Sequence, residues 1–191
     1  MPPALAPSRG MTQASIIPFN GKTPVIHPSA FIAPGVRIIG DVTIGAEASI
    51  WYNCVLRGDV NAIRIGARSN IQDGTVIHCD ADKGFVKGTP TVIEEEALIG
   101  HMAMLHGCTV GRNALVGLGS IVMDGCVLEE NSMLAAGGML TPGKSIGSFQ
   151  MWGGRPAKFM RELDENWATG NRLAVAHYVQ NGQAHKAACG D

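Results

Sequence analysis

The sequence is poor in aromatic and in charged side chains. Aromatic residues make up 5% and charged residues 16% of its 191 residues, and the formal net charge is −1. A chain without excess positive charge has no long-range field that attracts nucleic acid or an anionic membrane surface. No apolar run approaches the roughly 18 residues that a membrane-spanning helix needs. We therefore expect neither nucleic acid nor a membrane among its partners.

The sequence also lacks the cysteine patterns of a disulfide-stabilised or zinc-finger protein. Its five cysteines are odd in number and include no Cys-x-x-Cys pair. The first fifteen residues contain no apolar run of signal-peptide length. These features predict reduced thiols and a cytoplasmic protein.

What the sequence does have is a six-residue repeat of aliphatic residues. The residue four positions after each one, including Val60, is no larger than valine until the repeat ends near residue 144. A period of six fits neither an α-helix nor strands joined by regular hairpins. The aliphatic positions are Ile26, Ile32, Ile38, Ile44, Ile50, Leu56, Ile65, Ile71, Ile77, Ile93, Ile99, Leu105, Val110, Val116, Val122, Leu128, Leu134, Leu140 and Ile146.

A short strand followed by a sharp turn, repeated every six residues, accounts for this pattern. The large side chain fills the interior, the small one fits near the corner, and Gly, Asn or Asp relieves the turn. Three such units form a triangular coil, and stacked coils join through parallel strand ladders. We therefore predict an all-β solenoid, a parallel β-helix of about six coils over residues 15–152, with a β-sandwich as the alternative.

The repeat loses its phase after Ile146, and helical spacing follows. Pro156 suits the first position of a helix, and apolar residues then recur at intervals of three and four. We predict a C-terminal helix over residues 153–181 packed along the β-helix, a disordered extension at residues 1–14 and a flexible tail at residues 182–191. The apolar positions of this helix are Phe159, Met160, Leu163, Trp167, Leu173, Ala174, His177 and Tyr178.

Two of the histidines occupy the same position in the repeat. His78 directly follows Ile77, and His106 directly follows Leu105. Their separation equals one coil plus the excursion around residues 80–90. We therefore expect both side chains to point outward on one face, one above the other, on strands about 4.8 Å apart.

His101 stands at a different position, the second after Ile99, and belongs to the preceding face. One chain thus offers two imidazoles in one direction and a third in another. A three-fold oligomer that sets His101 beside a neighbour's His78 and His106 would complete a three-histidine site at each interface. Three imidazoles leave the fourth position of Zn²⁺ open to water, as in catalytic zinc sites. The alternative is that these histidines decorate exposed turns.

Three segments carry a resemblance to a known family. Leu56-Arg57-Gly58-Asp59, Asn70-Ile71-Gln72-Asp73-Gly74 with His78, and Gly100-His101 followed by Leu105-His106-Gly107 resemble the γ-class carbonic anhydrases and their relatives. The repeat itself resembles the left-handed β-helix of hexapeptide-repeat proteins, which implies a left-handed coil. The resemblance also implies a homotrimer with Zn²⁺, or alternatively Fe²⁺ or Co²⁺, at its subunit interfaces. The implied reaction is the reversible hydration of CO2 to bicarbonate.

The resemblance implies a role for each residue around the metal. His78, His101 and His106 would be the metal ligands. Gln72 would hydrogen-bond the metal-bound water or bicarbonate, and its amide can orient that ligand but cannot act as a base. Asn70 would help to orient the same ligand.

Four further residues have implied roles at the subunit boundary. Arg57 and Asp59 would pair across the trimer interface, and Asp73 would act in the same network. Tyr178 would match a tyrosine that leans into the site from the C-terminal helix. Removing one partner of such a charge pair would leave a partly buried charge without compensation.

The sequence departs from the active family members where protons are transferred. Those members carry a glutamate just after the Arg-x-Asp motif, where this chain has Val60, and a longer acidic loop after the first histidine. The loop here is short. Asp80 or Asp82 is the candidate proton carrier, and the alternative is that both are solvated carboxylates of a turn. Cys79 adjoins a ligand and is most simply a turn residue.

A metal-dependent acyl-CoA thioesterase, an acyltransferase and a non-catalytic zinc-binding trimer are the alternative functions.

Overall fold

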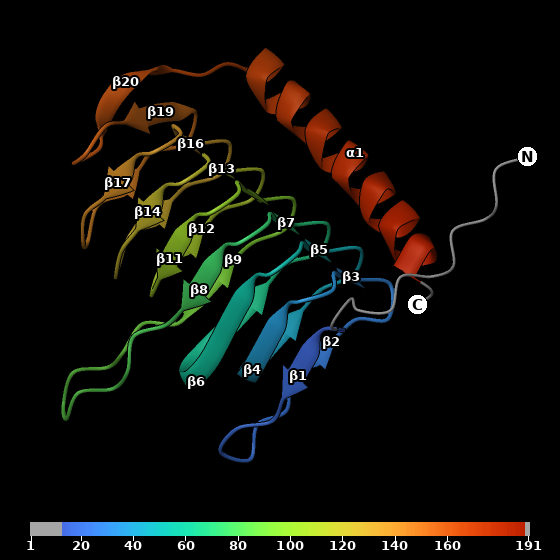
Figure 1. Cartoon of the computed structure of the whole chain (residues 1–191). Helices are drawn as coiled ribbons and strands as arrows, with labels where there is room; N and C mark the ends of the chain where they lie inside the picture. The colour runs from blue at the N-terminus through green and yellow to red at the C-terminus, as the bar shows by residue number, and fades with distance from the viewer. Residues whose placement is uncertain (1–12, 190–191) are drawn as a thin grey trace, which may run out of the picture.

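The structure, a computed structural model, describes residues 13–189. In this range, twenty short strands and one helix form a β-solenoid (Figure 1). Each coil contributes three strands and is therefore triangular in cross-section, and every strand pair is parallel except the last one along the chain. The predicted parallel solenoid of hexapeptide repeats is confirmed. The predicted extension at residues 1–14 falls almost wholly outside the described range.

The coils stack into three faces, two of which share one 12-stranded sheet because two long strands bend around their common corner. Face 1 contains β1 (Ser15–Ile17), the first halves of β4 (Arg37–Ile44) and β6 (Val55–Ile65), β8 (Val76–His78), β11 (Met104–His106), β14 (Ile121–Val122) and β17 (Met139–Leu140). Face 2 contains β2 (Val25–Ile26), the second halves of β4 and β6, β9 (Thr91–Ile93), β12 (Thr109–Val110), β15 (Val127–Leu128) and β18 (Ser145–Ile146).

Face 3 is a separate 8-stranded sheet. It contains β3 (Phe31–Ile32), β5 (Ser49–Ile50), β7 (Asn70–Ile71), β10 (Leu98–Ile99), β13 (Leu115–Val116), β16 (Met133–Leu134), β19 (Gln150–Gly153) and β20 (Lys158–Glu162). The chain runs from face 3 to face 1 and then to face 2 in each coil. The corners between the faces therefore carry the turns.

The interior is a stack of the predicted aliphatic side chains. From Ile38 to Ile146, every one of the repeat positions is no more than 3% exposed. Burial of each such side chain stabilises the fold by about 1.5–3 kcal/mol. Two of the predicted small interior residues are exceptions: Val60 is 48% exposed, and Thr109 is half-buried because Cys108 before it takes the interior position. The three extra residues of β6 bulge outward at the corner, and Ile63 is the buried residue that follows.

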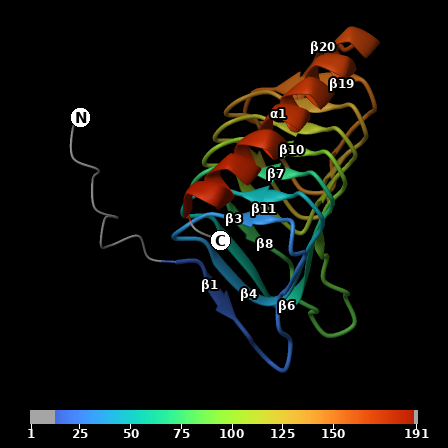
Figure 2. The same ribbon diagram turned by 90° about the vertical axis from the view of Figure 1, so that its right-hand side faces the viewer.

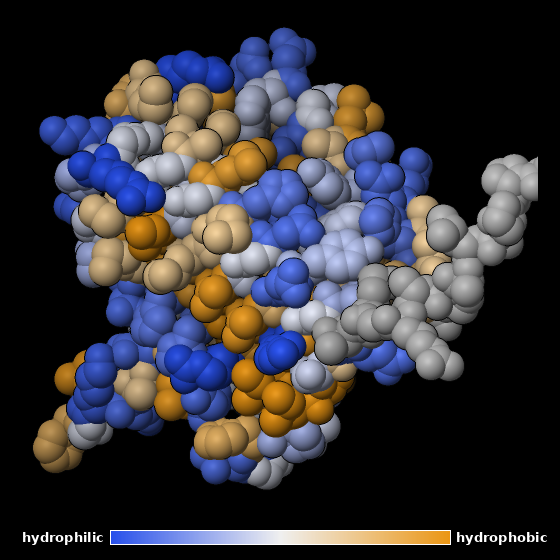
Figure 3. Space-filling model, viewed as in Figure 1, coloured by the Kyte–Doolittle hydropathy of each residue, from blue (hydrophilic) through white to orange (hydrophobic). Residues whose placement is uncertain are grey.

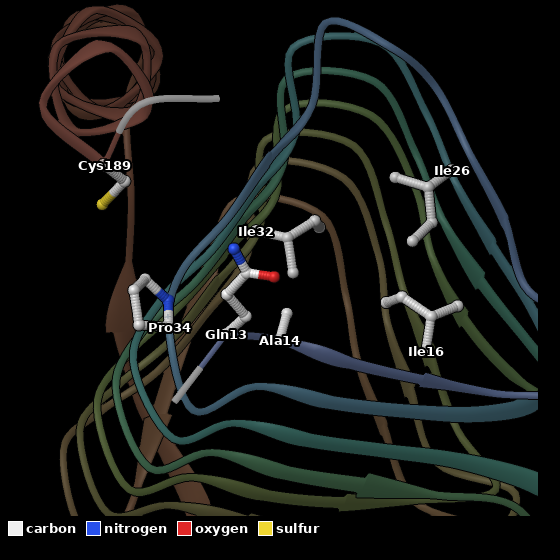
Figure 4. Close-up of a pocket in the computed structure, with 7 residues that line it drawn as sticks. All are labelled: Gln13, Ala14, Ile16, Ile26, Ile32, Pro34 and Cys189. Atoms are coloured by element: carbon white, nitrogen blue, oxygen red, sulfur yellow. The ribbon is translucent and has the colours of Figure 1, made fainter. Parts of the chain in front are cut away.

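Among the described residues, no coil covers the amino-terminal end of this interior stack. Ile26 and Ile32, the first two repeat positions, are only partly buried because no described coil lies beyond them. Together with Ile16 they line a cavity of about 330 Å³, and Cys189 from the far end of the chain also contributes to its wall (Figure 4). Apolar surface gathers around β1 and β2 in the same region (Figure 3).

A single helix, α1 (Glu165–Cys189), lies along face 3 and packs on β3, β5 and β7 (Figure 2). The Asp164 carboxylate accepts a hydrogen bond from the Trp167 backbone N–H at 2.8 Å, which caps the helix start. Its buried residues are mostly small, so the helix approaches the sheet closely. A Cβ at Gly182 would lie 3.3 Å from the Ser49 Cβ, so glycine permits this approach. The buried residues are Ala168, Asn171, Val175 and Gly182.

The predicted limits of this helix are wrong at both ends. The helix begins at Glu165 instead of residue 153, and it continues to Cys189 through most of the segment predicted to be a flexible tail. Residues 158–162 form β20, which pairs antiparallel with β19 and leaves Phe159 and Met160 exposed. The last coil presents unpaired backbone groups at its edge, and satisfying them outweighs the helical spacing of these residues. Leu173, predicted on the packed face, is 69% exposed.

The five cysteines, Cys54, Cys79, Cys108, Cys126 and Cys189, are all free, and all but the last are buried. Burial raises the pKa of the Cys54 thiol to about 12, so this group stays protonated at neutral pH. These thiols act as small interior side chains. Within residues 13–189, no helix is both long and apolar enough to cross a membrane.

A ladder of buried asparagines ties α1 to the coils. The Asn171 amide donates hydrogen bonds to the backbone oxygen and the Oδ1 of Asn113, both at 3.0 Å. The Asn113 amide donates in turn to Asn131 Oδ1 at 2.8 Å and to the Ala168 carbonyl at 3.1 Å. All three asparagine side chains lie in the buried seam between helix and sheet.

We predict that Asn171→Ala lowers the free energy of unfolding by about 1–3 kcal/mol, because it leaves buried oxygens of Asn113 without a donor. Urea denaturation measures this difference. Asn166→Ala, at an exposed position of the same helix, is the matched control and is expected to change stability by less than about 0.5 kcal/mol. Equal losses in the two variants would contradict the role assigned to the ladder.

Candidate metal centre

His78 and His106 meet at the end of face 1. They terminate β8 and β11, and the two residues are directly paired in the strand register. The His78 Nδ1 lies 3.0 Å from the His106 Nε2, and the ring centroids are 5.0 Å apart. The predicted stacking of these two side chains on one face is confirmed.

An aspartate holds the outer nitrogen of each ring. The His78 Nε2 lies 2.9 Å from Asp59 Oδ1, and the His106 Nδ1 lies 2.5 Å from Asp124 Oδ1. Arg57 donates a further hydrogen bond to Asp59 at 2.7 Å. Carboxylates placed in this way fix the orientation of metal-binding imidazoles and leave the other nitrogen as the ligand. The two nitrogens left over here are the ones that face each other.

The Asp59 carboxyl is tuned to remain ionised. Partial burial raises its pKa, but the hydrogen bonds from His78 and Arg57 together outweigh burial and hold the pKa below its usual value. Asp59 therefore keeps its charge at neutral pH and continues to orient His78.

His101 lies apart from this pair, at the corner between face 3 and face 1. Its Nδ1 is 2.8 Å from Asp73 Oδ2, and its backbone N–H donates to Gln72 Oε1 at 3.1 Å. Met102, with a positive φ of 57°, turns the chain directly after it. Within residues 13–189 of one chain, no group of three or more His, Cys, Asp or Glu side chains could hold a metal ion. All three candidate histidines nevertheless share one arrangement, an aspartate on a ring nitrogen.

The histidine pair suits Zn²⁺ in its donor atoms and in their spacing. Two ligands of a tetrahedral Zn²⁺ at about 2.0–2.1 Å lie ~3.3 Å from each other. The facing nitrogens of His78 and His106 are 3.0 Å apart, close to that value. These two atoms would hold the metal, and the site would need ligands from outside this pair to be complete.

The structure places Asn70 and Tyr178 over face 3, beneath and on α1. The Asn70 amide donates to Ser49 Oγ at 2.8 Å, and its buried Oδ1 has no hydrogen-bond partner among the described residues. Tyr178 packs edge-on against Trp51, with ring centroids 6.0 Å apart. One chain therefore does not bring either side chain to the histidine pair, and their catalytic roles stay predictions. The same holds for pairing of Arg57 across an interface, since within one chain it pairs with Asp59.

The hairpin that follows His78 stands out from the solenoid between β8 and β9 (Figure 1). Its carboxylates, the candidate proton carriers, are paired with lysines. Hydrogen bonds from Lys83 to Asp80 and from Lys87 to Asp82, each 2.8 Å long, hold the pKa of both carboxyls below the usual value. Proton transfer at neutral pH is served best by a pKa near 7, so these pairs are poorly matched to that task. Cys79 is buried, and burial raises the pKa of its thiol.

Asp124 is the residue that sequence reasoning did not identify. It lies in the turn after β14, one coil beyond His106 and at the same corner. The sequence could have indicated Asp124 by its place in the repeat, because it follows His106 by one coil of 18 residues and its side chain can therefore reach that ring.

The chain is similar to known proteins over most of its length. Residues 23–58 match the family described as bacterial transferase hexapeptide (six repeats). The chain is 43% identical to the mitochondrial gamma carbonic anhydrase 2 of Arabidopsis thaliana over 164 residues, 86% of this chain and 59% of that protein. It is 44% identical to the carbonic anhydrase of Geobacillus kaustophilus over 172 residues, 90% of this chain and 91% of that protein. The chain belongs to the γ-carbonic anhydrase family.

A solved structure shows the same family fold. The crystal structure of a hexapeptide transferase family protein from Anaplasma phagocytophilum matches with a TM-score of 0.82 and 47% identity, over 89% of this chain and 97% of that one. The chain spans only about three fifths of the Arabidopsis γ-carbonic anhydrase. It spans nearly the whole of the Geobacillus relative.

We predict that Asp124→Ala lowers the affinity for Zn²⁺ by about 10–100-fold, because the His106 ring loses the carboxylate that orients it. Competition with a chromophoric chelator measures this affinity. Asp82→Ala removes an exposed carboxylate from the neighbouring hairpin and is expected to leave the affinity unchanged. An Asp124→Ala protein with wild-type affinity would show that the carboxylate does not support the ligand.

Proposed function

We propose that the chain is a zinc-dependent enzyme of the γ-carbonic anhydrase type that hydrates CO2 reversibly to bicarbonate, at a metal site shared between subunits of a homotrimer. The observation that carries the proposal is the pair of facing nitrogens on His78 and His106, each ring supported by an aspartate. Relatives of 43% and 44% identity are named carbonic anhydrases. Fe²⁺ or Co²⁺ are alternatives to Zn²⁺. A cytoplasmic location is part of the proposal, supported by the free cysteines.

The surface between the two ligand corners supports the trimer. His78 and His106 lie at one edge of face 1, and His101 lies at the opposite edge. From β6 to β17, the outward residue of each strand is apolar, and the register aligns these residues in one column. The same position carries Arg37 in β4 and Ser15 in β1. Met102 beside His101 is 70% exposed. The column consists of Val55, Val76, Met104, Ile121 and Met139.

A cyclic trimer explains why this apolar column and the two corners occur together. If the three copies turn face 1 toward a common axis, each copy buries its column. The His101 corner of one copy then lies against the His78 and His106 corner of the next. Three equivalent interfaces would each hold one complete three-histidine site.

The residues around this site would each have a defined task. Bound Zn²⁺ would supply hydroxide near neutral pH by lowering the pKa of a coordinated water to about 7. Asp59, Asp124 and Asp73 would keep the three imidazoles oriented through the contacts seen in one chain. The Gln72 Oε1 already accepts a hydrogen bond from the His101 backbone, so its NH2 group would be free to donate to a bicarbonate oxygen.

Proton export is the step for which the chain is poorly equipped. Val60 occupies the position of the glutamate of active members, and both hairpin carboxylates are paired with lysines. We predict that CO2 hydration by the zinc-loaded protein rises several-fold as imidazole buffer is increased at constant pH and ionic strength, because imidazole then carries the proton. Stopped-flow indicator assays measure the rate. A rate that is high and independent of buffer would reveal a proton carrier within the protein.

The shared site is tested by complementation between two inactive variants. His101→Ala and His106→Ala, each alone, are expected to bind no Zn²⁺ at neutral pH. When the two chains are co-expressed, one of the three interfaces in a mixed cyclic trimer joins an intact His78 and His106 to an intact His101. Zinc and activity are therefore expected to return to about one third of the sites in mixed trimers. Metal analysis and sedimentation equilibrium check this result.

The outcome separates the candidate functions. Zinc retained by the His101→Ala protein alone would contradict a site shared between subunits. A zinc-loaded trimer without CO2 hydration, even in imidazole, would favour a metal-dependent thioesterase or a non-catalytic zinc-binding trimer. The name of the Anaplasma relative indicates a transferase of unstated substrate. An acyltransferase would not need the three histidines.

A further inference from the structure

Beside the corner that carries His78 and His106 there is a surface pocket that has no role in the proposed reaction. Its volume is about 260 Å³, and it lies between the loop of residues 18–24 and the outward bend of β6. The Asp59 that supports His78 is also part of the pocket wall. Asn61, also in the wall, donates a hydrogen bond from its amide to the Asp80 carbonyl at 3.1 Å and so ties the bend to the hairpin. The pocket therefore adjoins the candidate metal centre.

The wall of this pocket presents apolar side chains to solvent. Phe19, Val60 and Ala62 line it, and Phe19 and Val60 are both exposed although they are large and apolar. Paired backbone hydrogen bonds of 2.9 and 3.0 Å between Phe19 and Lys22 close the loop that carries Phe19. The bulge of β6 holds Val60 outward. Apolar side chains that the backbone holds around a hollow are typical of a ligand site.

The basic side chains around the pocket outnumber its carboxylates by one. Asp41 Oδ1 is bound by Arg64 at 2.6 Å, and Asp59 is bound by Arg57 at 2.7 Å and by His78 at 2.9 Å. Lys22, by contrast, is 3.9 Å from Asp41 Oδ2, and its side chain is 66% exposed. Both carboxylates thus have closer partners, and the long ion pair with Asp41 leaves the exposed ammonium of Lys22 room to bind an anion as well.

We propose that this pocket binds a small organic anion, a short-chain carboxylate whose hydrocarbon part lies against Phe19 and Val60 and whose charge is compensated by Lys22. One liquid water occupies about 30 Å³, so the pocket has room for on the order of eight heavy atoms. CO2 and bicarbonate need far less. The size of the pocket therefore favours a ligand that carries an organic group. That such a ligand also reaches the metal rests on the proposed function, whereas its binding does not.

The test uses butyrate and acetate as probes on the full chain, with affinity measured by saturation-transfer NMR titration. Butyrate is expected to bind about tenfold more tightly than acetate, because two more methylene groups leave water. Val60→Asp is expected to weaken butyrate binding at least tenfold, and Lys22→Gln several-fold. Val60→Ile keeps the apolar wall and is expected to retain binding. Leu173→Asp, at an exposed apolar position on α1, is the matched control and should leave binding unchanged.

Folding and metal are controlled separately. Circular dichroism of Val60→Asp, together with the milder Val60→Ser, shows whether a loss of binding has a structural cause. The titration is repeated on the His101→Ala protein without metal, where butyrate binding is expected to persist. Binding without metal would stand even if the wild-type protein proved to be neither trimeric nor zinc-loaded, so the pocket and the proposed function can fail independently.

Three results would overturn the proposal. Butyrate that binds no better than acetate would mean that the apolar wall is not used. Affinity unchanged in the Val60→Asp protein would place the probe elsewhere. Binding that disappears with the metal and ignores Val60 would mean that the carboxylate is simply a metal ligand.

Discussion

The burial of one aliphatic side chain per short strand is the constraint on which the rest of this structure depends. From Ile38 onward each of these side chains is almost fully buried, so a coil cannot slip relative to its neighbours without exposing the whole stack. The register that results brings His78 directly beside His106, although 27 residues separate them. It also aligns the apolar column of face 1. The candidate metal centre is therefore a consequence of core packing.

In the site itself, an aspartate carboxylate orients each of the three candidate imidazoles. Asp59, Asp124 and Asp73 each hold one ring nitrogen of a candidate ligand, and none of the three histidines is left to rotate freely. One chain brings only two of these rings together, because His101 occupies the opposite edge of face 1. The cyclic trimer that we propose would explain both the incomplete site in one chain and the apolar surface between its two halves. The pocket beside Asp59 adds room for a ligand larger than CO2.

Sequence reasoning succeeded where one periodic pattern decided the outcome and failed where local spacing competed with tertiary pairing. The solenoid, its buried positions and the stacked histidines follow from the period of six. Residues 158–162 have helical spacing, yet they form a strand because the last coil offers an unpaired edge. Val60 fits the small-residue rule, yet it is exposed because extra residues at that corner have no interior space to fill. The helix start depended on Asp164, a single capping residue that apolar spacing does not reveal.

By itself the sequence determined the solenoid and the stacking of the two candidate ligands, His78 and His106, because a strict repeat converts position along the chain into position in space. Handedness came from family resemblance and not from the spacing. Only the tertiary structure decided which carboxylate supports which imidazole, since Asp124 comes from a different coil than His106. It also decided that Gly182 lies close on Ser49 and that Phe19, Lys22 and Val60 border one hollow. These contacts involve residues of turns, insertions and the helix, whose positions the six-residue repeat does not specify. Their side chains come together only after the coils have stacked.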